Sequence, residues 1–256
     1  MHPRSRASDR APVISLASTK GGVGKTTLAY VLATAFARRV GSGNPGIPEH
    51  RGAGFPVISC LDADPNRTLS EALRLTGMPE IRVTESDGER LLPDLRAAQA
   101  EARLVIIDLE GSANQAMLYA AGKSDLVLVP AQPSRFDVVE AVKTVGVVRQ
   151  AADLVGRDIL YRVVLSRTPV LRQRVADHSR TQFKKAGLPL LSVELVQRTA
   201  FQTMTYTGEP PFRQDPAGGA AANVEALVDE VAGLLGLALP LHGEGEGRAV
   251  AETAEA

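Results

Sequence analysis

The chain has 256 residues, of which 44% are hydrophobic and 23% charged, with 29 basic and 29 acidic side chains. This length suits one large α/β domain or two small ones, and the apolar content allows a sizeable core. The formal net charge of zero excludes a protein that is basic over its whole surface. The single cysteine, Cys60, excludes an intrachain disulfide and fits a reducing cytosol.

Apolar runs of strand length alternate with segments of helical periodicity along the chain. The expected strands are 12–18, 57–64, 81–86, 103–111, 125–134, 159–168 and 188–195. The expected helices are 25–40, 68–77, 89–102, 112–124, 136–156, 170–187, 198–208 and 221–239, and the Gly- and Pro-rich segment 41–56 is expected to be a loop. Because most strands are apolar on both faces, we expect a mostly parallel, twisted α/β sheet with helices on both faces. It would form a single domain over 12–238, between a disordered arm at 1–11 and a disordered acidic tail at 239–256.

A glycine-rich segment, KGGVGKTT (20–27), joins the first expected strand to the first expected helix. Its glycines let backbone N–H groups turn toward phosphate oxygens, and the positive end of the helix points to the same place. In such a loop Lys25 reaches the β- and γ-phosphates, Thr26 holds Mg²⁺ and Thr27 contacts the α-phosphate. The expected nucleotide-binding residues are Gly21, Gly22, Val23, Gly24, Lys25, Thr26 and Thr27.

Acidic residues stand at the ends of two further expected strands. Asp62 and Asp64 are two residues apart, so on a strand they share a face, and Asp108 directly follows the run LVII. In open parallel sheets, ligands bind at the carboxyl ends of the strands. Asp108 is therefore well placed to hold a water molecule that is bound to Mg²⁺. Glu110 could be a supporting acid or a solvated loop residue.

Three segments in order resemble the ParA/MinD superfamily of ATPases, and specifically its ParA-type partition proteins. KGGVGKTT resembles the family's deviant Walker A loop, CLDADPNRTL (60–69) its second motif, and LVIIDLEGSAN (104–114) its Walker B and switch II strand. The resemblance runs from about residue 12 to residue 235 and implies a P-loop NTPase-like fold with ATP and Mg²⁺ as cofactors. It implies that Asp64 orients the attacking water, and that Asp62 joins Thr26 and Asp108 in the surroundings of the metal.

The lysine before the glycines, Lys20, is not needed to bind the phosphates of its own subunit, where it would compete with Lys25 for nearly the same space. The resemblance implies that Lys20 reaches across an ATP-bound homodimer to the phosphates of the other subunit. The expected catalytic residues are then Lys20, Lys25 and Asp64. Lys20 could also strengthen the dimer without a catalytic role, or be a solvated surface lysine.

The segment from Arg157 to Arg198 contains nine basic residues and only three acidic ones. The resemblance implies that ATP-bound dimers bind DNA non-specifically through a basic C-terminal face, which phosphate contacts without base readout would explain. The alternative is an ordinary solvated helix. The candidate DNA-binding residues are Arg172, Arg174, Arg180, Lys184, Lys185 and Arg198.

The function implied by the resemblance is a cytoplasmic, nucleoid-associated ATPase that partitions a plasmid or another replicon with a ParB-like or other cargo adaptor. Two alternatives remain, namely the positioning of a protein cargo such as a chemoreceptor cluster or organelle, and a low-turnover nucleotide-dependent scaffold that aids DNA transfer. The tail is glycine-rich and acidic, so a membrane-targeting helix is not expected there.

Overall fold

The computed structural model describes residues 10–41, 57–112, 114–171 and 173–239. The expected arm, loop and tail lie almost wholly outside these ranges, as does Arg172. Among the described residues, no helix combines the length and the apolar character needed to cross a bilayer.

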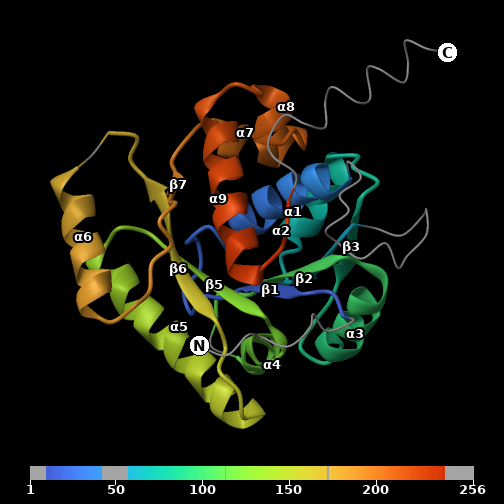
Figure 1. Cartoon of the computed structure of the whole chain (residues 1–256), viewed down its shortest axis with the longest axis horizontal. Coiled ribbons are helices and arrows are strands. Elements are labelled where there is room, and N and C mark those ends of the chain that lie inside the picture. Colours follow the sequence, from blue (N-terminus) through green and yellow to red (C-terminus); the bar gives the residue numbers. More distant parts are fainter. Residues whose placement is uncertain (1–9, 42–56, 113, 172, 240–256) are drawn as a thin grey trace.

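Seven parallel strands form a single sheet in the order β3-β2-β4-β1-β5-β6-β7 (Figure 1). Strands β1, β2, β4 and β5 are buried along their whole length, which explains why their sequences are continuous apolar runs. The strand bounds are β1 Val13–Leu16, β2 Ile58–Ala63, β3 Ile81–Glu85, β4 Leu104–Leu109, β5 Leu126–Ala131, β6 Tyr161–Thr168 and β7 Leu195–Val196. The expected parallel α/β sheet is confirmed.

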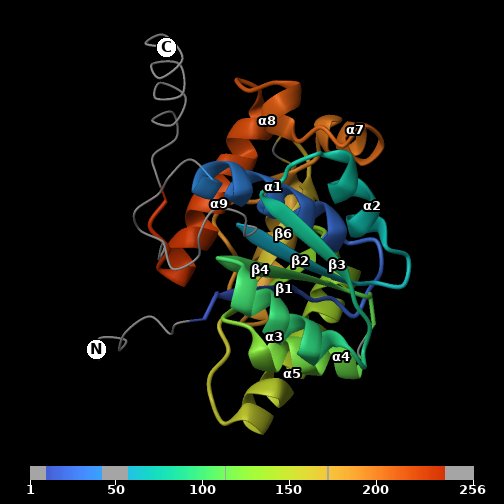
Figure 2. The same cartoon turned by 90° about the vertical axis from the view of Figure 1, so that its right-hand side faces the viewer.

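Helices cover both faces of this sheet, as the turned view in Figure 2 shows. One hydrophobic core joins the sheet to α1, α2, α7 and α9, and a second core joins the opposite face to α3, α4, α5 and α6. The helix bounds are α1 Lys25–Gly41, α2 Thr68–Leu75, α3 Leu91–Glu101, α4 Gln115–Lys123, α5 Arg135–Val155, α6 Arg174–Lys185, α7 Ala200–Thr207, α8 Pro211–Gln214 and α9 Gly219–Leu235.

The C-terminal third departs from the sequence-based expectation in three places. The expected strand 188–195 is reduced to β7 and one bridge between Leu190 and Val163, because the N–H groups of Ser192 and Val193 donate to the Glu230 carboxylate instead, at 2.7 and 2.8 Å. The expected helix 170–187 begins only at α6, four residues later. The short helix α8, which has proline at its start, was not predicted.

Strand β1 lies at the centre of the sheet, with β4 on one side and β5 on the other. The chain moves outward from β1 through β2 to β3, returns to β4, and then crosses to β5 on the other side. Such a reversal of strand order opens a crevice at the carboxyl ends of the strands. The glycine-rich segment follows β1 at this point.

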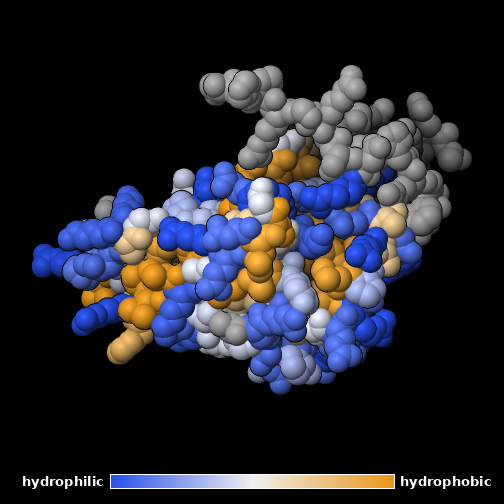
Figure 3. All heavy atoms as spheres, turned by 90° about the horizontal axis from the view of Figure 1, so that it is seen from below, coloured by the Kyte–Doolittle hydropathy of each residue, from blue (hydrophilic) through white to orange (hydrophobic). Residues whose placement is uncertain are grey.

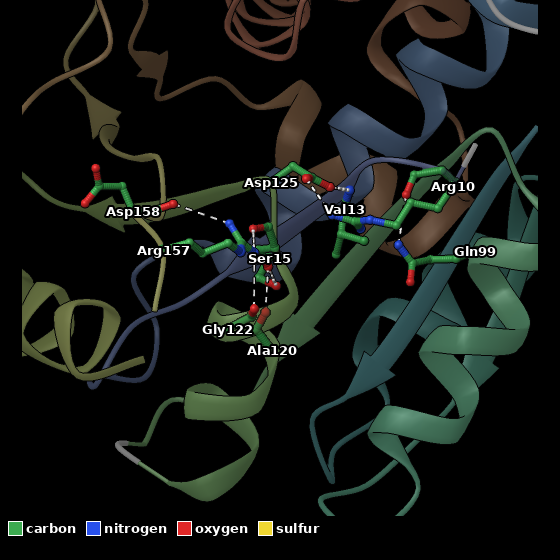
Figure 4. Close-up of polar contacts among 11 residues, drawn as sticks. Arg10, Val13, Ser15, Gln99, Ala120, Gly122, Asp125, Arg157 and Asp158 are labelled. Atoms are coloured by element: carbon green, nitrogen blue, oxygen red, sulfur yellow. Dashed lines mark hydrogen bonds and ion pairs between the residues drawn. The ribbon is translucent and has the colours of Figure 1, made fainter. Parts of the chain in front are cut away.

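At the amino ends of the strands, opposite to the crevice, polar contacts fix the start of β1 (Figure 4). Asp125 accepts the Val13 N–H at 2.9 Å and pairs with Arg10 at 2.8 Å, so residue 10 already contacts the domain. The buried hydroxyls of Ser15 and Ser124 lie 2.6 Å apart, and Arg157 donates to the carbonyls of Gly122 and Ser124. These contacts satisfy the polar groups at the amino ends of β1 and β5, so the edge is structural.

Candidate phosphate and metal site

The glycine-rich segment forms a loop whose shape depends on two of its glycines. Gly22 and Gly24 have φ angles of 74° and 100°, in the left-handed region that glycine adopts without strain. The loop is held from β6 by the Ser166 hydroxyl, which donates to the Val23 carbonyl at 2.6 Å. From the end of β5, the Gln132 amide donates to the Gly22 carbonyl at 3.2 Å. The neighbouring strands therefore fix the shape of the loop.

Gly111, which follows β4, touches the same loop. A Cβ atom at Gly111 would lie only 2.8 Å from the nitrogen and 2.9 Å from the Cα of Gly21, closer than real Cβ contacts allow. Only glycine fits this approach of two backbones. Gly111 lies within the motif LVIIDLEGSAN, but nothing in that motif indicates this close approach.

Lys25 is buried at the start of α1 and faces three acidic side chains. Burial lowers the pKa of Lys25, whereas the negative charges of Asp108, Asp64 and Glu110 oppose that shift. Lys25 begins α1 and Asp108 lies on β4, whereas Asp64 and Glu110 directly follow β2 and β4, so the four residues meet at the carboxyl edge of the sheet. The structure thus brings together Lys25, Asp64 and Asp108 as the sequence predicts, and it adds the exposed Glu110 to their surroundings.

Asp108 is fully buried between its neighbours on β1 and β2, Leu16 and Asp62. Neither of its carboxylate oxygens has a partner in good hydrogen-bond geometry among the described residues, which is unusual for a buried acid, although the Thr26 hydroxyl is close enough to stabilise the charged form. Burial raises the pKa of Asp108 to about 7, and the Asp62 charge adds to the shift, while Thr26 and Lys25 oppose it. A cation or a metal-bound water would supply the missing partner.

Among the described residues, no three His, Cys, Asp or Glu side chains are placed to hold a metal ion together. Mg²⁺ does not require such a cage, because it retains several waters and uses one or two protein oxygens together with substrate phosphates. The unpartnered carboxylate of Asp108 and the nearby hydroxyl of Thr26 fit that habit. The residues present are therefore compatible with a nucleotide-bound Mg²⁺.

Asp62 is the neighbour of Asp108 on β2, and two backbone N–H groups engage its carboxylate. Its two carboxylate oxygens accept the backbone N–H groups of Asp64 at 3.2 Å and of Ser70 at 2.8 Å. Asp62 therefore anchors the loop that carries Asp64 to the start of α2. Asp64 itself is half-buried and accepts two hydrogen bonds from Asn66, both at 2.9 Å.

Arg67 completes this loop in a way that the sequence did not reveal. It has a φ angle of 56°, which is uncommon for a residue with a side chain. Its guanidinium donates to the carbonyl oxygens of Asp62 and Ser86, and so ties the ends of β2 and β3 together. Backbone strain of this kind clusters at functional sites.

Lys20 has a partner on its own chain that is not one of the acids around Lys25. Its ammonium group lies 3.1 and 3.3 Å from the two carboxylate oxygens of Asp137 on α5. Asp137 is buried, and it also receives the Ser134 hydroxyl at the start of the same helix. The Lys20 ammonium group is therefore held at α5, with 39% of its side chain exposed.

Helix α5 also holds the residue before Lys20. The Thr19 N–H donates to the Thr144 hydroxyl at 3.0 Å, and the Thr19 hydroxyl donates to the Glu140 carboxylate at 2.8 Å. Asp137, Glu140 and Thr144 are spaced by three and four residues, so they share one face of α5. Two successive residues at the entry to the phosphate loop, Thr19 and Lys20, are thus bound by three residues of this helix.

The candidate DNA-binding residues fall into different environments. Arg174, Lys184 and Lys185 on α6 are exposed. Arg180 is engaged by Glu194 at 2.5 and 2.7 Å and by Asp177 at 2.8 Å, and the Arg198 guanidinium is half-buried against Gly219 at the start of α9. Three of the six candidates therefore present an exposed cationic group, and Arg172 lies outside the described residues.

Comparisons with known proteins agree with this geometry. Residues 14–41 match the model of the CobQ/CobB/MinD/ParA nucleotide binding domain. The chain is 28% identical over 218 residues to a ParA protein of Rhizobium radiobacter, covering 84% of this chain and 91% of that protein. It is 23% identical over 230 residues to the maintenance of carboxysome distribution protein A of Halothiobacillus neapolitanus, covering 88% and 98%.

Solved structures share the fold at low sequence identity. An ATP complex of McdA from Cyanothece superposes with a TM-score of 0.69 at 16% identity, covering 91% of this chain and 99% of that one. MinD of Pyrococcus horikoshii with Mg-ADP superposes with a TM-score of 0.66 at 17% identity, covering 88% and 98%. The matched loop and the similarity to ParA over most of both chains point to the ParA/MinD superfamily of ATPases, and the solved structures show that the chain has the same fold.

Proposed function

We propose that the protein hydrolyses ATP, dimerises when ATP is bound, binds DNA non-specifically and, with an adaptor protein, partitions a plasmid or another replicon. The observation that carries the hydrolytic part is the meeting of Lys25, Asp64 and the unpartnered carboxylate of Asp108 beside a phosphate loop. The similarity to a ParA protein over 84% of the chain supports partition as the process.

Each residue of the site has a task in phosphoryl transfer, which depends mainly on positioning and charge neutralisation. Lys25 and the loop N–H groups would bind the phosphates. Thr26 and waters on Asp108 would hold Mg²⁺, whose charge offsets that of the phosphates. Asp64 would orient the attacking water, on a loop that Asp62 and Arg67 keep in place.

Lys20 would supply a charge to the other subunit of the dimer. In the described structure it pairs with Asp137 on its own chain, so delivery in trans requires that this pair opens. ATP would then join two subunits because each completes the site of the other, and the loss of the γ-phosphate would separate them.

The basic part of this proposal rests on α6. Arg174, Lys184 and Lys185 are exposed and without an acidic partner in the described part of the chain, which suits contacts to DNA phosphates. The protein as a whole is neutral, so such binding would be confined to this face.

A second candidate function is the positioning of a protein cargo by the same ATP-dependent cycle. The similarity over 230 residues to a protein named for the distribution of carboxysomes favours it. Deletion of the gene separates the two: increased loss of a replicon supports partition, whereas normal inheritance with a mislocalised protein assembly supports cargo positioning.

The hydrolytic proposal is tested by ATP turnover with Mg²⁺, with and without DNA. Lys25→Ala should abolish nucleotide binding, and Asp64→Ala should retain binding but lose turnover. Lys123→Ala, at the exposed end of α4, is the matched control and should behave as the wild type. Tight ATP binding by Lys25→Ala, or no turnover by the wild type with DNA and adaptor present, would contradict the proposal.

A further inference from the structure

Helix α5 has a second face that the proposed chemistry does not use. Phe136, Val139 and Val142 are 79%, 49% and 46% exposed. Their spacing of three residues places them on the side of the helix opposite to its buried residues, which include Ala141, Val145 and Val148. We call these three exposed residues the α5 stripe.

Hydrophobic atoms gather on the surface at the end of the molecule that carries the start of α5. Figure 3, seen from below, shows several hydrophobic areas, and one of them lies at the end of the molecule where Figure 1 places α6 and the start of α5. Exposed apolar patches of soluble proteins mark contact sites when they form a group, whereas single exposed residues do not. A phenylalanine that is four-fifths exposed is the kind of anchor that such sites use.

The charges around the α5 stripe are unbalanced. Each acidic side chain near it is already engaged: Asp137 by Lys20, Glu140 by Lys143 and Thr19, and both Asp177 and Glu194 by Arg180. By contrast, exposed cations without an acidic partner among the described residues flank it, namely Arg135 at the start of α5 and the lysine pair Lys184 and Lys185 at the end of α6. Phe183, which precedes that lysine pair, packs in the same core as α5.

This combination selects the chemistry of the partner. Two copies of the chain that met stripe to stripe would bring like charges together, which disfavours self-association. DNA phosphates can pair with the lysine pair, as in the proposed function, but they would leave the three apolar side chains of the stripe without a contact. An amphipathic helix with an apolar face and acidic flanks satisfies both features.

We propose that the α5 stripe is a docking site for an acidic amphipathic helix of the adaptor protein. This proposal rests on the proposed function, because it takes the adaptor protein as the partner that binds at the stripe. The inner face of the same helix grips Thr19 and Lys20, so a partner bound to the outer face contacts the element that holds the entry of the phosphate loop.

Binding can be measured without turnover, which separates this proposal from the proposed function. The probes are two fluorescein-labelled amphipathic helices of leucine with glutamate and of leucine with lysine, and the readout is fluorescence anisotropy with the full chain. We expect the acidic helix to bind and the basic helix not to bind. Phe136→Ser should weaken the binding of the acidic helix about tenfold or more, as removal of an anchor residue does.

The matched control is Leu154→Ser, which removes an exposed leucine from the far end of the same helix. It should bind like the wild type, and a thermal melt should show that both variants are folded. Arg135→Glu should weaken the binding of the acidic helix without removing any apolar atom of the stripe.

Four results would overturn the proposal. They are no binding of the acidic helix, equal or tighter binding of the basic helix, an equal effect of the two serine variants, and self-association of the wild type that Phe136→Ser abolishes in sedimentation. The last result would assign the stripe to a second copy of the chain. If ATP turnover fails while the acidic helix binds as expected, the hydrolytic function is wrong and the docking site stands.

Discussion

Lys20 at the mouth of the phosphate loop is paired with the buried Asp137 of its own subunit, 117 residues further along the chain. The partners are unequally exposed, with 39% of the Lys20 side chain and 3% of the Asp137 side chain accessible. The lysine can therefore leave toward solvent, whereas the carboxylate cannot follow it. Opening of this pair would therefore decide whether Lys20 is available to the other subunit of the proposed dimer.

Lys20→Ala should destabilise the nucleotide-free protein, because it leaves the Asp137 carboxylate buried with fewer partners. We expect a decrease of about 1–3 kcal/mol in the free energy of unfolding, measured with urea. The double variant Lys20→Ala/Asp137→Asn should recover most of this stability, because the neutral amide needs no cation. A double variant that is no more stable than Lys20→Ala would show that the carboxylate does not depend on Lys20.

The same pair should also affect dimerisation. Asp137→Asn releases Lys20 and should increase ATP-dependent dimer formation, measured by sedimentation, whereas Lys20→Ala should reduce dimers and turnover while ATP still binds. If dimerisation and turnover survive Lys20→Ala unchanged, Lys20 has no role in trans.

Gly111 should tolerate no side chain. In Gly111→Ala the new Cβ would meet the backbone of Gly21 at 2.8–2.9 Å, so the phosphate loop or the end of β4 must shift. We expect weaker ATP binding, measured by calorimetry, and lower turnover. The matched control is Gly146→Ala inside α5, where a Cβ meets nothing within 4 Å and alanine should stabilise the helix by about 0.5–1 kcal/mol. Equal ATP affinity of Gly111→Ala and the wild type would disprove the close approach.

Asp108 should give the metal-free protein a characteristic pH dependence. Its pKa is about 7 in the folded chain against an ordinary value of 3.8, so between these values the folded state holds a proton that the unfolded state has released. The contribution of Asp108 to stability therefore decreases as pH rises from about 4 to about 7 and is constant above that. A shift of this size corresponds to about 4 kcal/mol at most.

Asp108→Asn removes this contribution and should be more stable than the wild type at pH 8, with a smaller difference at pH 5. Urea unfolding in EDTA at both pH values measures the effect, and Asp158→Asn, in the exposed connection between α5 and β6, is the control. The assignment fails if the two variants show the same difference from the wild type at each pH. With Mg²⁺ and ATP present, Asp108→Asn should lose turnover.

The strands and the phosphate loop could be predicted because their signals are local. A buried parallel strand is a continuous apolar run, and the loop motif stands between one such run and a helix. The acids Asp64 and Asp108 could be assigned to one edge because parallel strands end together. These inferences needed no knowledge of distant contacts.

What the sequence could not reveal were contacts made between distant elements. The sequence around Lys20 does not indicate its ion pair with Asp137, and the sequence around Arg180 does not indicate its ion pair with Glu194. The strand expected at 188–195 has suitable apolar residues, but Glu230 on α9 takes two of its N–H groups. In each case a side chain far along the chain decides the outcome.

The ion pairs of Arg180 change which residues of α6 should bind DNA. Lys184→Ala/Lys185→Ala removes two exposed cations and should weaken ATP-dependent DNA binding at all sequences. The slope of its salt dependence should fall by about one unit for each phosphate that the variant no longer binds.

Arg180→Ala should instead lower stability, because it deprives Glu194 and Asp177 of this shared partner. Its DNA affinity should stay close to that of the wild type while it is folded. Anisotropy titrations of a labelled duplex at several salt concentrations measure both variants. If Arg180→Ala weakens DNA binding as much as the double lysine variant does, Arg180 leaves its acidic partners to reach the DNA, and the ion pairs belong to the DNA-free protein alone.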